Sequence, residues 1–159
     1  MIDMNDNLTS DISSPISIER IMDMIPHRYP LLLIDKITSL VSHKSATGIK
    51  NVTYNENYFQ GHFPVRPVMP GVLIIESMAQ TAALLVVHSL GEEAEGKLVY
   101  FMSIDGARFR KPVIPGDQMT IHVTKQHKHG KVWKFLCEAT VDGTLVAEAK
   151  IAAMIMDRE

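Results

Sequence analysis

A histidine and a carboxylate near the middle of the sequence could together carry out acid–base chemistry. His62 stands in a turn rich in glycine and proline, and Glu76 follows within a long apolar run. Histidine is the side chain whose ordinary pKa lies nearest neutrality, so it is the usual group for moving protons at neutral pH. A carboxyl group in an apolar helix can stay protonated, because desolvation disfavours its charged form unless a cation or hydrogen bonds offset this. The pair predicts proton transfer on an apolar substrate.

The same two residues also allow a purely structural interpretation. His62 could be a hydrogen-bonded turn histidine, and Glu76 could pair with a basic residue at a subunit contact, since perturbed carboxylates are often structural. A helix that begins at Pro70 or Gly71 would present free N–H groups and a positive dipole end, which can polarise a carbonyl group. The spacing alone leaves both interpretations open.

The helix that carries Glu76 is predicted to be the core of the fold. It should begin near Pro70 or Gly71 and end at Gly91. Its residues leave no broad polar face, so other protein should surround it on nearly all sides. Polar residues interrupt the run, which favours a buried helix over a membrane span. The places where water, substrate or another subunit could meet it form one narrow polar seam: Glu76, Ser77, Gln80 and Thr81.

The flanking residues predict a sheet around this helix. A short helix capped by Ser17 should end at Pro26, and Gly130 and Gly143 should lie in hairpin turns that need positive φ. We expect α+β architecture, with the last four strands forming an antiparallel meander. The predicted strands span residues 31–41, 44–53, 98–109, 118–128, 131–141 and 145–156.

Composition narrows the class of protein. The chain has 159 residues and a net charge of −2, which suits one globular domain and argues against a nucleic-acid binder. Cys137 is the only cysteine, so no intrachain disulfide can form, and its apolar flanks predict a packed thiol. Residues 1–15 are polar, unlike a signal peptide, and should be a mobile tail before a domain over 16–159. We expect a cytoplasmic protein without membrane insertion.

Two further groups of charged or titratable residues have competing interpretations. A basic cluster could attract an acidic partner or a phosphate group, or it could be a solvated strand edge protected by its charge. A set of alternating histidines could suggest a metal site, but no Cys, Asp or Glu completes a ligand set, so no metal is expected. These groups are Arg108, Arg110 and Lys111 for the cluster, and His122, His127 and His129 for the histidines.

The motifs around His62 and Glu76 resemble those of a known enzyme family. The sequence from about residue 18 onward is similar to the bacterial 3-hydroxyacyl-[acyl-carrier-protein] dehydratases of the FabZ type, which act in type II fatty-acid synthesis. The matching motifs are residues 26–30 (PHRYP), 61–64 (GHFP), 69–72 (MPGV), Glu76, Ala79, Gln80, 100–101 (YF), 115–117 (PGD) and 146–149 (VAEA).

This resemblance implies a hotdog fold, a curved antiparallel sheet around one central helix. It also implies a homodimer, assembled further into a hexamer as a trimer of dimers, with active sites at the dimer interface. His62 of one subunit would take the C2 proton of a (3R)-3-hydroxyacyl thioester, and Glu76 of the partner subunit would help the C3 hydroxyl leave as water. The thioester carbonyl would accept from the Gly71 N–H, and the Val68 carbonyl would orient His62.

Further expectations from the resemblance concern the substrate. The acyl chain would arrive on the phosphopantetheine of an acyl carrier protein, no other cofactor would be needed, and the product would be a trans-2-enoyl thioester. Phe63, Pro70 and Tyr100 would line the acyl tunnel, with Tyr100 as a gate. Glutamate at position 76, where the isomerising FabA-type relatives have aspartate, indicates the non-isomerising type.

The sequence alone leaves two other functions as alternatives. A thioesterase of the same fold would release free thiol, but such hydrolases usually lack the His-Phe-Pro turn together with a helix glutamate. A non-catalytic acyl-thioester sensor would need an added DNA-binding segment, which a polar tail of about fifteen residues does not provide.

Overall fold

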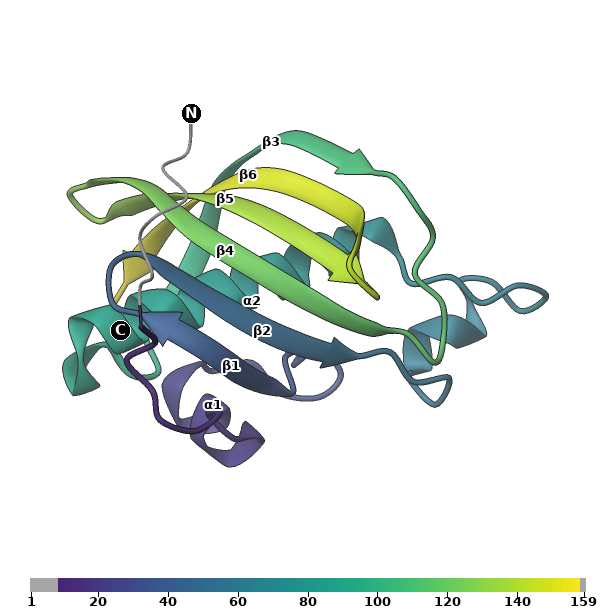
Figure 1. Ribbon diagram of the computed structural model, residues 1–159, viewed down its shortest axis with the longest axis horizontal. Helices are drawn as coiled ribbons and strands as arrows, with labels where there is room; N and C mark the ends of the chain where they lie inside the picture. The colour runs from purple at the N-terminus through teal and green to yellow at the C-terminus, as the bar shows by residue number, and fades with distance from the viewer. Residues whose placement is uncertain (1–8, 158–159) are drawn as a thin grey trace.

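The computed structural model describes residues 9–157 and shows one antiparallel sheet wrapped around one long helix (Figure 1). The predicted α+β architecture is confirmed. In chain order the elements are α1 (Ile18–Met24), β1 (Lys36–Val41), β2 (Ser45–Asn51), the 3-10 helix η1 (Asn57–Gln60), α2 (Gly71–Leu90), the 3-10 helix η2 (Glu92–Ala94), β3 (Leu98–Phe109), β4 (Gln118–His129), β5 (Val132–Val141) and β6 (Thr144–Met156).

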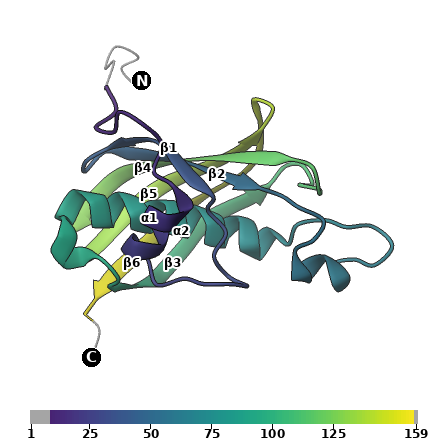
Figure 2. The same ribbon diagram turned by 90° about the horizontal axis from the view of Figure 1, so that it is seen from below.

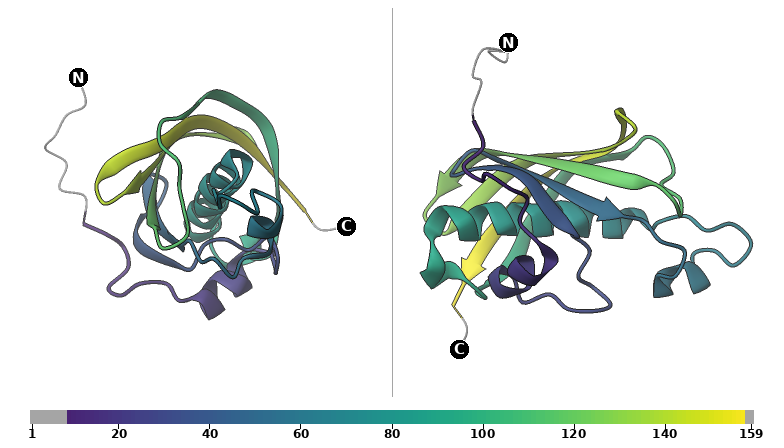
Figure 3. Two further views of the ribbon diagram at one scale, coloured as in Figure 1. Left: turned by 90° about the vertical axis from the view of Figure 1, so that its right-hand side faces the viewer. Right: turned by 60° about the horizontal axis from the view of Figure 1, so that its bottom comes forward.

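Helix α2 begins and ends where the sequence predicts. Pro70 is its N-cap residue, and Gly91 follows its last turn with a φ of 91°, a value that favours glycine. The helix is long and apolar enough to span a membrane by length and composition, yet two-thirds of its most apolar stretch is buried inside the fold. Seen end-on in the left panel of Figure 3, the sheet arches around α2, and α1 lies beside the helix on the side that the sheet leaves uncovered (Figures 2 and 3).

The inner face of the sheet is apolar because side chains alternate along each strand. In β5, for example, Trp133, Phe135, Cys137 and Ala139 are buried and face the helix, while their neighbours are more exposed. The predicted packing of Cys137 is confirmed, and its burial raises the pKa of the thiol far above its ordinary value.

The order of the strands differs from the prediction. The sheet runs β1-β2-β4-β5-β6-β3, so only β4, β5 and β6 form a meander. β4 pairs with β2 on one side and β5 on the other, which leaves no free edge on β4 for β3. β3 instead pairs with β6 and lies at the far edge of the sheet, and residues 110–117 carry the chain from there back to β4.

The predicted strand over 31–41 is too long at its start, since β1 begins at Lys36. The backbone of Leu31 and Leu33 bonds to the side chain of Gln80 on α2 and not to a neighbouring strand. Residues 31–35 therefore form a loop before β1, and hydrogen bonds to Gln80 hold this loop against α2.

The expected mobile tail over 1–15 needs correction where the structure describes it. The Asp11 N–H donates to the Leu40 carbonyl at 2.7 Å, and Ile16 forms a bridge with Ile37. The segment from residue 10 onward is thus tied to β1. Residues 1–8 lie outside the part of the chain that the structure describes.

The sheet packs tightly against α2 at Gly48 of β2. A Cβ atom at this position would lie 2.8 Å from Oγ1 of Thr81, a buried hydroxyl that donates to the Ser77 carbonyl. Gly48→Ala should lower the free energy of unfolding by about 1–3 kcal/mol, because overpacking forces the core to shift. Urea unfolding at a fixed protein concentration would measure this.

A second substitution separates overpacking from a loss of glycine flexibility. In a Thr81→Ala background the added methyl group would occupy vacated space, so the cost of Gly48→Ala should shrink or vanish. An equal cost in both backgrounds would contradict the steric explanation.

Candidate active site

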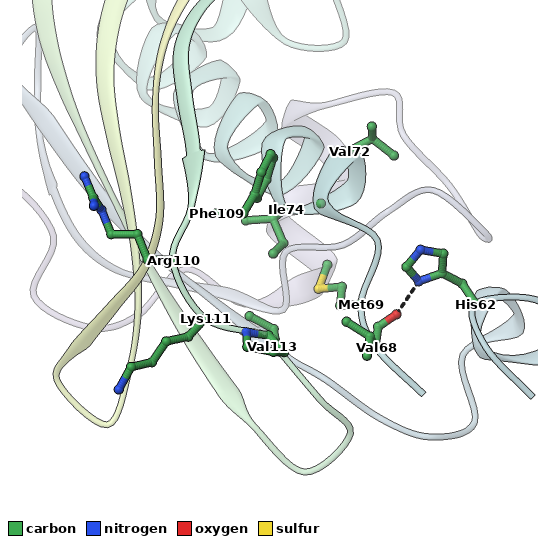
Figure 4. A pocket seen from close by; sticks show the side chains of 11 residues that line it. His62, Val68, Met69, Val72, Ile74, Phe109, Arg110, Lys111 and Val113 are labelled. Atoms are coloured by element: carbon green, nitrogen blue, oxygen red, sulfur yellow. Dashed lines mark hydrogen bonds between the residues drawn. The ribbon is translucent and has the colours of Figure 1, made fainter. Parts of the chain in front are cut away.

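His62 is fixed in the loop between η1 and α2 by its own hydrogen bonds. Its Nδ1 lies 2.7 Å from the Val68 carbonyl oxygen (Figure 4), and its backbone N–H donates to the Tyr58 carbonyl oxygen. A carbonyl can only accept, so Nδ1 must carry a hydrogen. In the neutral ring the lone pair is therefore on Nε2, which makes Nε2 the basic atom.

The loop around His62 closes on itself. Phe63 and Arg66 exchange two backbone hydrogen bonds, and the Val68 N–H donates back to the His62 carbonyl at 3.0 Å. The Phe63 ring stacks on the imidazole with a centroid distance of 4.0 Å, and the peptide bond between these two residues is cis. His62 is thus held in one orientation by short-range contacts.

The first turn of α2 offers free backbone donors beside His62. The N–H groups of Gly71 and Val72 have no acceptor within residues 9–157, since the capping bonds to Pro70 begin at Leu73. A Cβ atom at Gly71 would meet the ring of Phe109 at 2.9 Å, so only glycine lets the helix start so close to this ring. These donors can polarise a carbonyl group.

His62 and this helix start open on one apolar cavity of about 530 Å³. Its volume falls in the range of small-molecule sites. The residues that line it come from the His62 loop, the start of α2 and the segment after β3 (Figure 4): His62, Val68, Met69, Gly71, Val72, Ile74, Phe109, Arg110, Lys111, Pro112 and Val113.

Glu76 lies in the second turn of α2, and its side chain retains 18% exposure. Its Oε1 accepts from Gln80 Nε2 at 2.9 Å. Gln80 is fully buried and is itself held by the loop over 31–33, where it donates to Leu31 and accepts from Leu33. One carboxylate oxygen of Glu76 is thus anchored through a chain of buried hydrogen bonds.

The polar seam predicted on α2 is open only at Glu76. Ser77, Gln80 and Thr81 are fully buried, and the two hydroxyl groups donate to backbone carbonyls one turn earlier. The prediction that all four could meet substrate is therefore wrong for three of them. Their hydrogen bonds are satisfied within the helix or by the loop packed on it.

Glu76 and His62 open on different cavities of the chain. Glu76 lines a smaller cavity of about 140 Å³, formed with residues of α2, β3 and the segment after α1. Neither cavity is lined by both side chains. The smaller cavity is lined by His27, Glu76, Ala79, Ala83, Val99, Tyr100 and Phe101.

β3 forms a wall of this second cavity and is also an unpaired sheet edge. Its apolar side chains are exposed on both faces, with Tyr100 53%, Phe101 40% and Met102 54% accessible. A long apolar edge strand is a template for pairing with another chain. Within residues 9–157 nothing covers this edge.

The remaining predicted residues lie around these cavities. Arg110 forms a two-point ion pair with Glu148, at 2.9 and 3.4 Å, and this bond holds the pKa of Glu148 below its ordinary value. Arg108 donates to its neighbouring carbonyl, and Lys111 lines the His62 cavity. Pro70 caps α2 and lines neither cavity.

The histidines on β4 lie away from both cavities. His122 bonds to Thr47 at 2.9 Å through Nδ1, whereas His127 and His129 are exposed near the β4–β5 turn. No group of three or more His, Cys, Asp or Glu side chains placed to hold a metal ion occurs among the residues with described positions.

Sequence reasoning missed His27 as a site residue. In the sequence His27 stands out only as part of the motif at 26–30, with no role of its own, yet its Nε2 lies 3.4 Å from Glu76 Oε1. The available signal was the motif PHRYP at 26–30, which carries part of the family resemblance. Without the fold, nothing places this motif against a helix fifty residues later.

Comparison with known proteins places this geometry in a family. Residues 25–150 match the family model described as the FabA-like domain. The chain is 64% identical over 155 residues to the 3-hydroxyacyl-[acyl-carrier-protein] dehydratase FabZ of Paramagnetospirillum magneticum, covering 98% of this chain and 96% of that one. It is 63% identical to the protein of the same name from Rhodospirillum rubrum, with 94% of each chain covered.

Solved structures with much lower identity share the fold. The Xenorhabdus doucetiae dehydratase heterocomplex ApeI:P contains a chain that matches with a TM-score of 0.73 and 17% identity, covering 87% of this chain and 91% of that one. A hypothetical thioesterase with coenzyme A from Streptococcus pneumoniae matches with a TM-score of 0.59 and 14% identity, covering 77% and 86%. The expected hotdog fold is confirmed.

Proposed function

The chain belongs to the FabZ-type 3-hydroxyacyl-[acyl-carrier-protein] dehydratases of the FabA-like family, and we propose that it converts (3R)-3-hydroxyacyl-[acyl-carrier-protein] to the trans-2-enoyl thioester and water. This hydro-lyase reaction is a step of fatty-acid biosynthesis. The observation that carries the proposal is the pairing of a basic His62 Nε2 with free N–H donors at the start of α2.

His62 acts as the base at C2. Nε2 takes the proton, and the electron pair of the C2–H bond moves toward the thioester carbonyl. The oxygen of that carbonyl accepts a hydrogen bond from the Gly71 N–H, at the positive end of α2. The Val68 carbonyl supports this role, because it fixes the tautomer and then stabilises the imidazolium that forms.

Glu76 acts as the acid at C3. As the C2–C3 double bond forms, the C3–O bond breaks, and the carboxyl proton of Glu76 passes to the leaving hydroxyl to give water. The proton on His62 and the vacancy on Glu76 are then reset by exchange with solvent. No redox step occurs, so the reaction needs no cofactor beyond the phosphopantetheine that carries the acyl chain.

The two groups act across a dimer interface, with His62 of one subunit facing Glu76 of the partner subunit. Two observations support this arrangement. The side chains open on different cavities of one chain, and the Glu76 cavity is bordered by the exposed apolar edge of β3. Pairing of two β3 edges would cover this surface and join the sheets. Assembly of such dimers into a trimer of dimers is a further expectation from the family.

The acyl carrier protein docks near the mouth of the His62 cavity. Arg108 and Lys111 form no ion pair with residues 9–157, whereas the charge of Arg110 is already balanced by Glu148. The two unpaired cations are suited to steering an acidic protein or the phosphate of its prosthetic group. Tyr100, beside Glu76, lines the acyl path, and Phe63 and Pro70, which line neither cavity, support it from the His62 loop and the start of α2. The enzyme works in the cytoplasm.

The purified protein should turn over a 3-hydroxyacyl thioester of acyl carrier protein without added metal or nucleotide. The measurement is the rise in enoyl-thioester absorbance, run beside a thiol assay on the same mixture. Turnover without thiol release is the expected result. Thiol release without enoyl product would indicate a thioesterase, and binding without either product would indicate a non-catalytic acyl-thioester protein.

A further inference from the structure

The segment after α1 brings a second histidine against the proposed acid. His27 Nε2 lies 3.4 Å from Glu76 Oε1, and both side chains line the cavity that borders β3. We propose that His27 is a positioning residue, whose Nε2–H donates to Oε1 and fixes the orientation of the Glu76 carboxyl group. This inference rests on the proposed function, since it assigns His27 a role through Glu76.

The surroundings of the other ring nitrogen indicate which form His27 takes. His27 Nδ1 is buried and has no hydrogen-bond partner within residues 9–157. A buried N–H without an acceptor is costly, which disfavours the imidazolium and the Nδ1–H tautomer. The remaining form carries its hydrogen on Nε2, the atom that faces Glu76.

A neutral donor suits the role of Glu76 better than a cation would. A full positive charge beside the carboxylate would favour its ionised form and oppose proton donation. A neutral N–H orients the group without that strong bias. The present distance is long for a hydrogen bond, and catalytic hydrogen bonds are often long before substrate binds and shorten in the complex.

The backbone at His27 is held firmly enough to position a side chain. The guanidinium of Arg28 donates to three carbonyl oxygens around the end of α1: Met22 at 2.8 Å, Ile25 at 3.0 Å and His27 itself at 2.7 Å. This side chain ties the residues after α1 to the helix. His27 is therefore presented from a fixed segment.

Gln80 supplies the second anchor to the same oxygen. Its Nε2 donates to Glu76 Oε1 at 2.9 Å and to Leu31 at 2.7 Å, so the segment over 27–33 holds Oε1 from two directions. When the carboxyl group is neutral, the oxygen that faces both donors, Oε1, would be its carbonyl oxygen. The acidic proton would then lie on Oε2, which no protein group engages among the described residues.

The test compares two replacements of similar size at position 27. His27→Met removes the donor, whereas His27→Gln keeps an N–H that can reach Oε1. We expect His27→Met to lower kcat by about 10- to 100-fold with little change in KM, and His27→Gln to restore most of that loss. Both are measured with the enoyl-thioester assay, after thermal unfolding has shown that each variant is folded.

A double-mutant cycle shows whether His27 acts through Glu76. In a Glu76→Gln background, His27→Met should cost much less than in the wild type, because the group it positions is gone. His88→Met is the matched control, since His88 near the end of α2 faces Asp11 and not the cavity, and it should leave kcat unchanged.

The outcomes separate this inference from the proposed function. A wild-type protein that makes no enoyl product would overturn the function itself. An active wild type whose kcat is unchanged by His27→Met, or falls equally in both backgrounds, would overturn the role of His27 alone. If His27→Met does not fold, His27→Gln alone decides: a kcat below about one tenth of wild type would contradict the positioning role.

Discussion

His62→Ala should lower kcat by about 10²- to 10⁴-fold, the range expected when a general base is removed. The substitution deletes Nε2 but leaves the fold of the loop, whose backbone bonds to Tyr58 and Val68 do not need the ring. Initial rates of enoyl-thioester formation would measure the loss. His122→Ala is the control, because His122 lies on β4 away from both cavities and its side chain bonds to Thr47. Full activity in a folded and oligomeric His62→Ala chain would remove His62 from the mechanism.

Mixing His62→Ala chains with Glu76→Gln chains should give activity far above the residual activity of either parent. If each site combines His62 of one subunit with Glu76 of the partner subunit, a mixed dimer has one doubly substituted site and one intact site. Random pairing of equal amounts then gives about a quarter of the wild-type sites. Co-expression with two different tags and purification through both would isolate the mixed dimer. An inactive mixed dimer would place both groups in one chain.

The helix and its chemistry could be predicted from the sequence because both depend on neighbouring residues. The start at Gly71 and the end at Gly91 follow from local backbone preferences, and the near-continuous apolar run indicates a buried helix. His62 and its acceptor Val68 are six residues apart, within one closed loop. Features of this kind can be predicted without knowledge of the tertiary structure, because the residues that determine them lie close together in the sequence.

The strand order and the surroundings of Glu76 could not be predicted in the same way. A strand pattern shows which residues extend, but not which edge a strand joins, so β3 was assigned to a meander that it does not enter. Likewise, Gln80 meets Leu31 and Glu76 meets His27 across about fifty residues of sequence. The sequence of the polar seam therefore does not show that Ser77, Gln80 and Thr81 are buried and hydrogen-bonded inside the protein.

The exposed edge of β3 predicts a large effect on both assembly and activity. Met102→Lys should convert the protein to monomers and lower its activity at least about 10²-fold at concentrations where the wild type is dimeric. Met102 lies in an irregular part of the β3–β6 pairing and is half exposed, so a lysine there is tolerated by the single chain. In a dimer joined through β3 the charge would be buried without a partner, at a cost of several kcal/mol.

Because a two-fold interface contains each residue twice, both subunits would bear this cost. Sedimentation velocity and the enoyl-thioester assay, run on the same samples, would follow assembly and activity together. Leu90→Lys is the control, since Leu90 is a partly exposed apolar residue at the last turn of α2, where a cation is favourable. If activity depends on a shared site, it should return as Met102→Lys is concentrated, in step with the fraction of dimer. A Met102→Lys protein that stays active as a monomer would show that one chain suffices, and would contradict the pairing of His62 with Glu76 of the partner subunit.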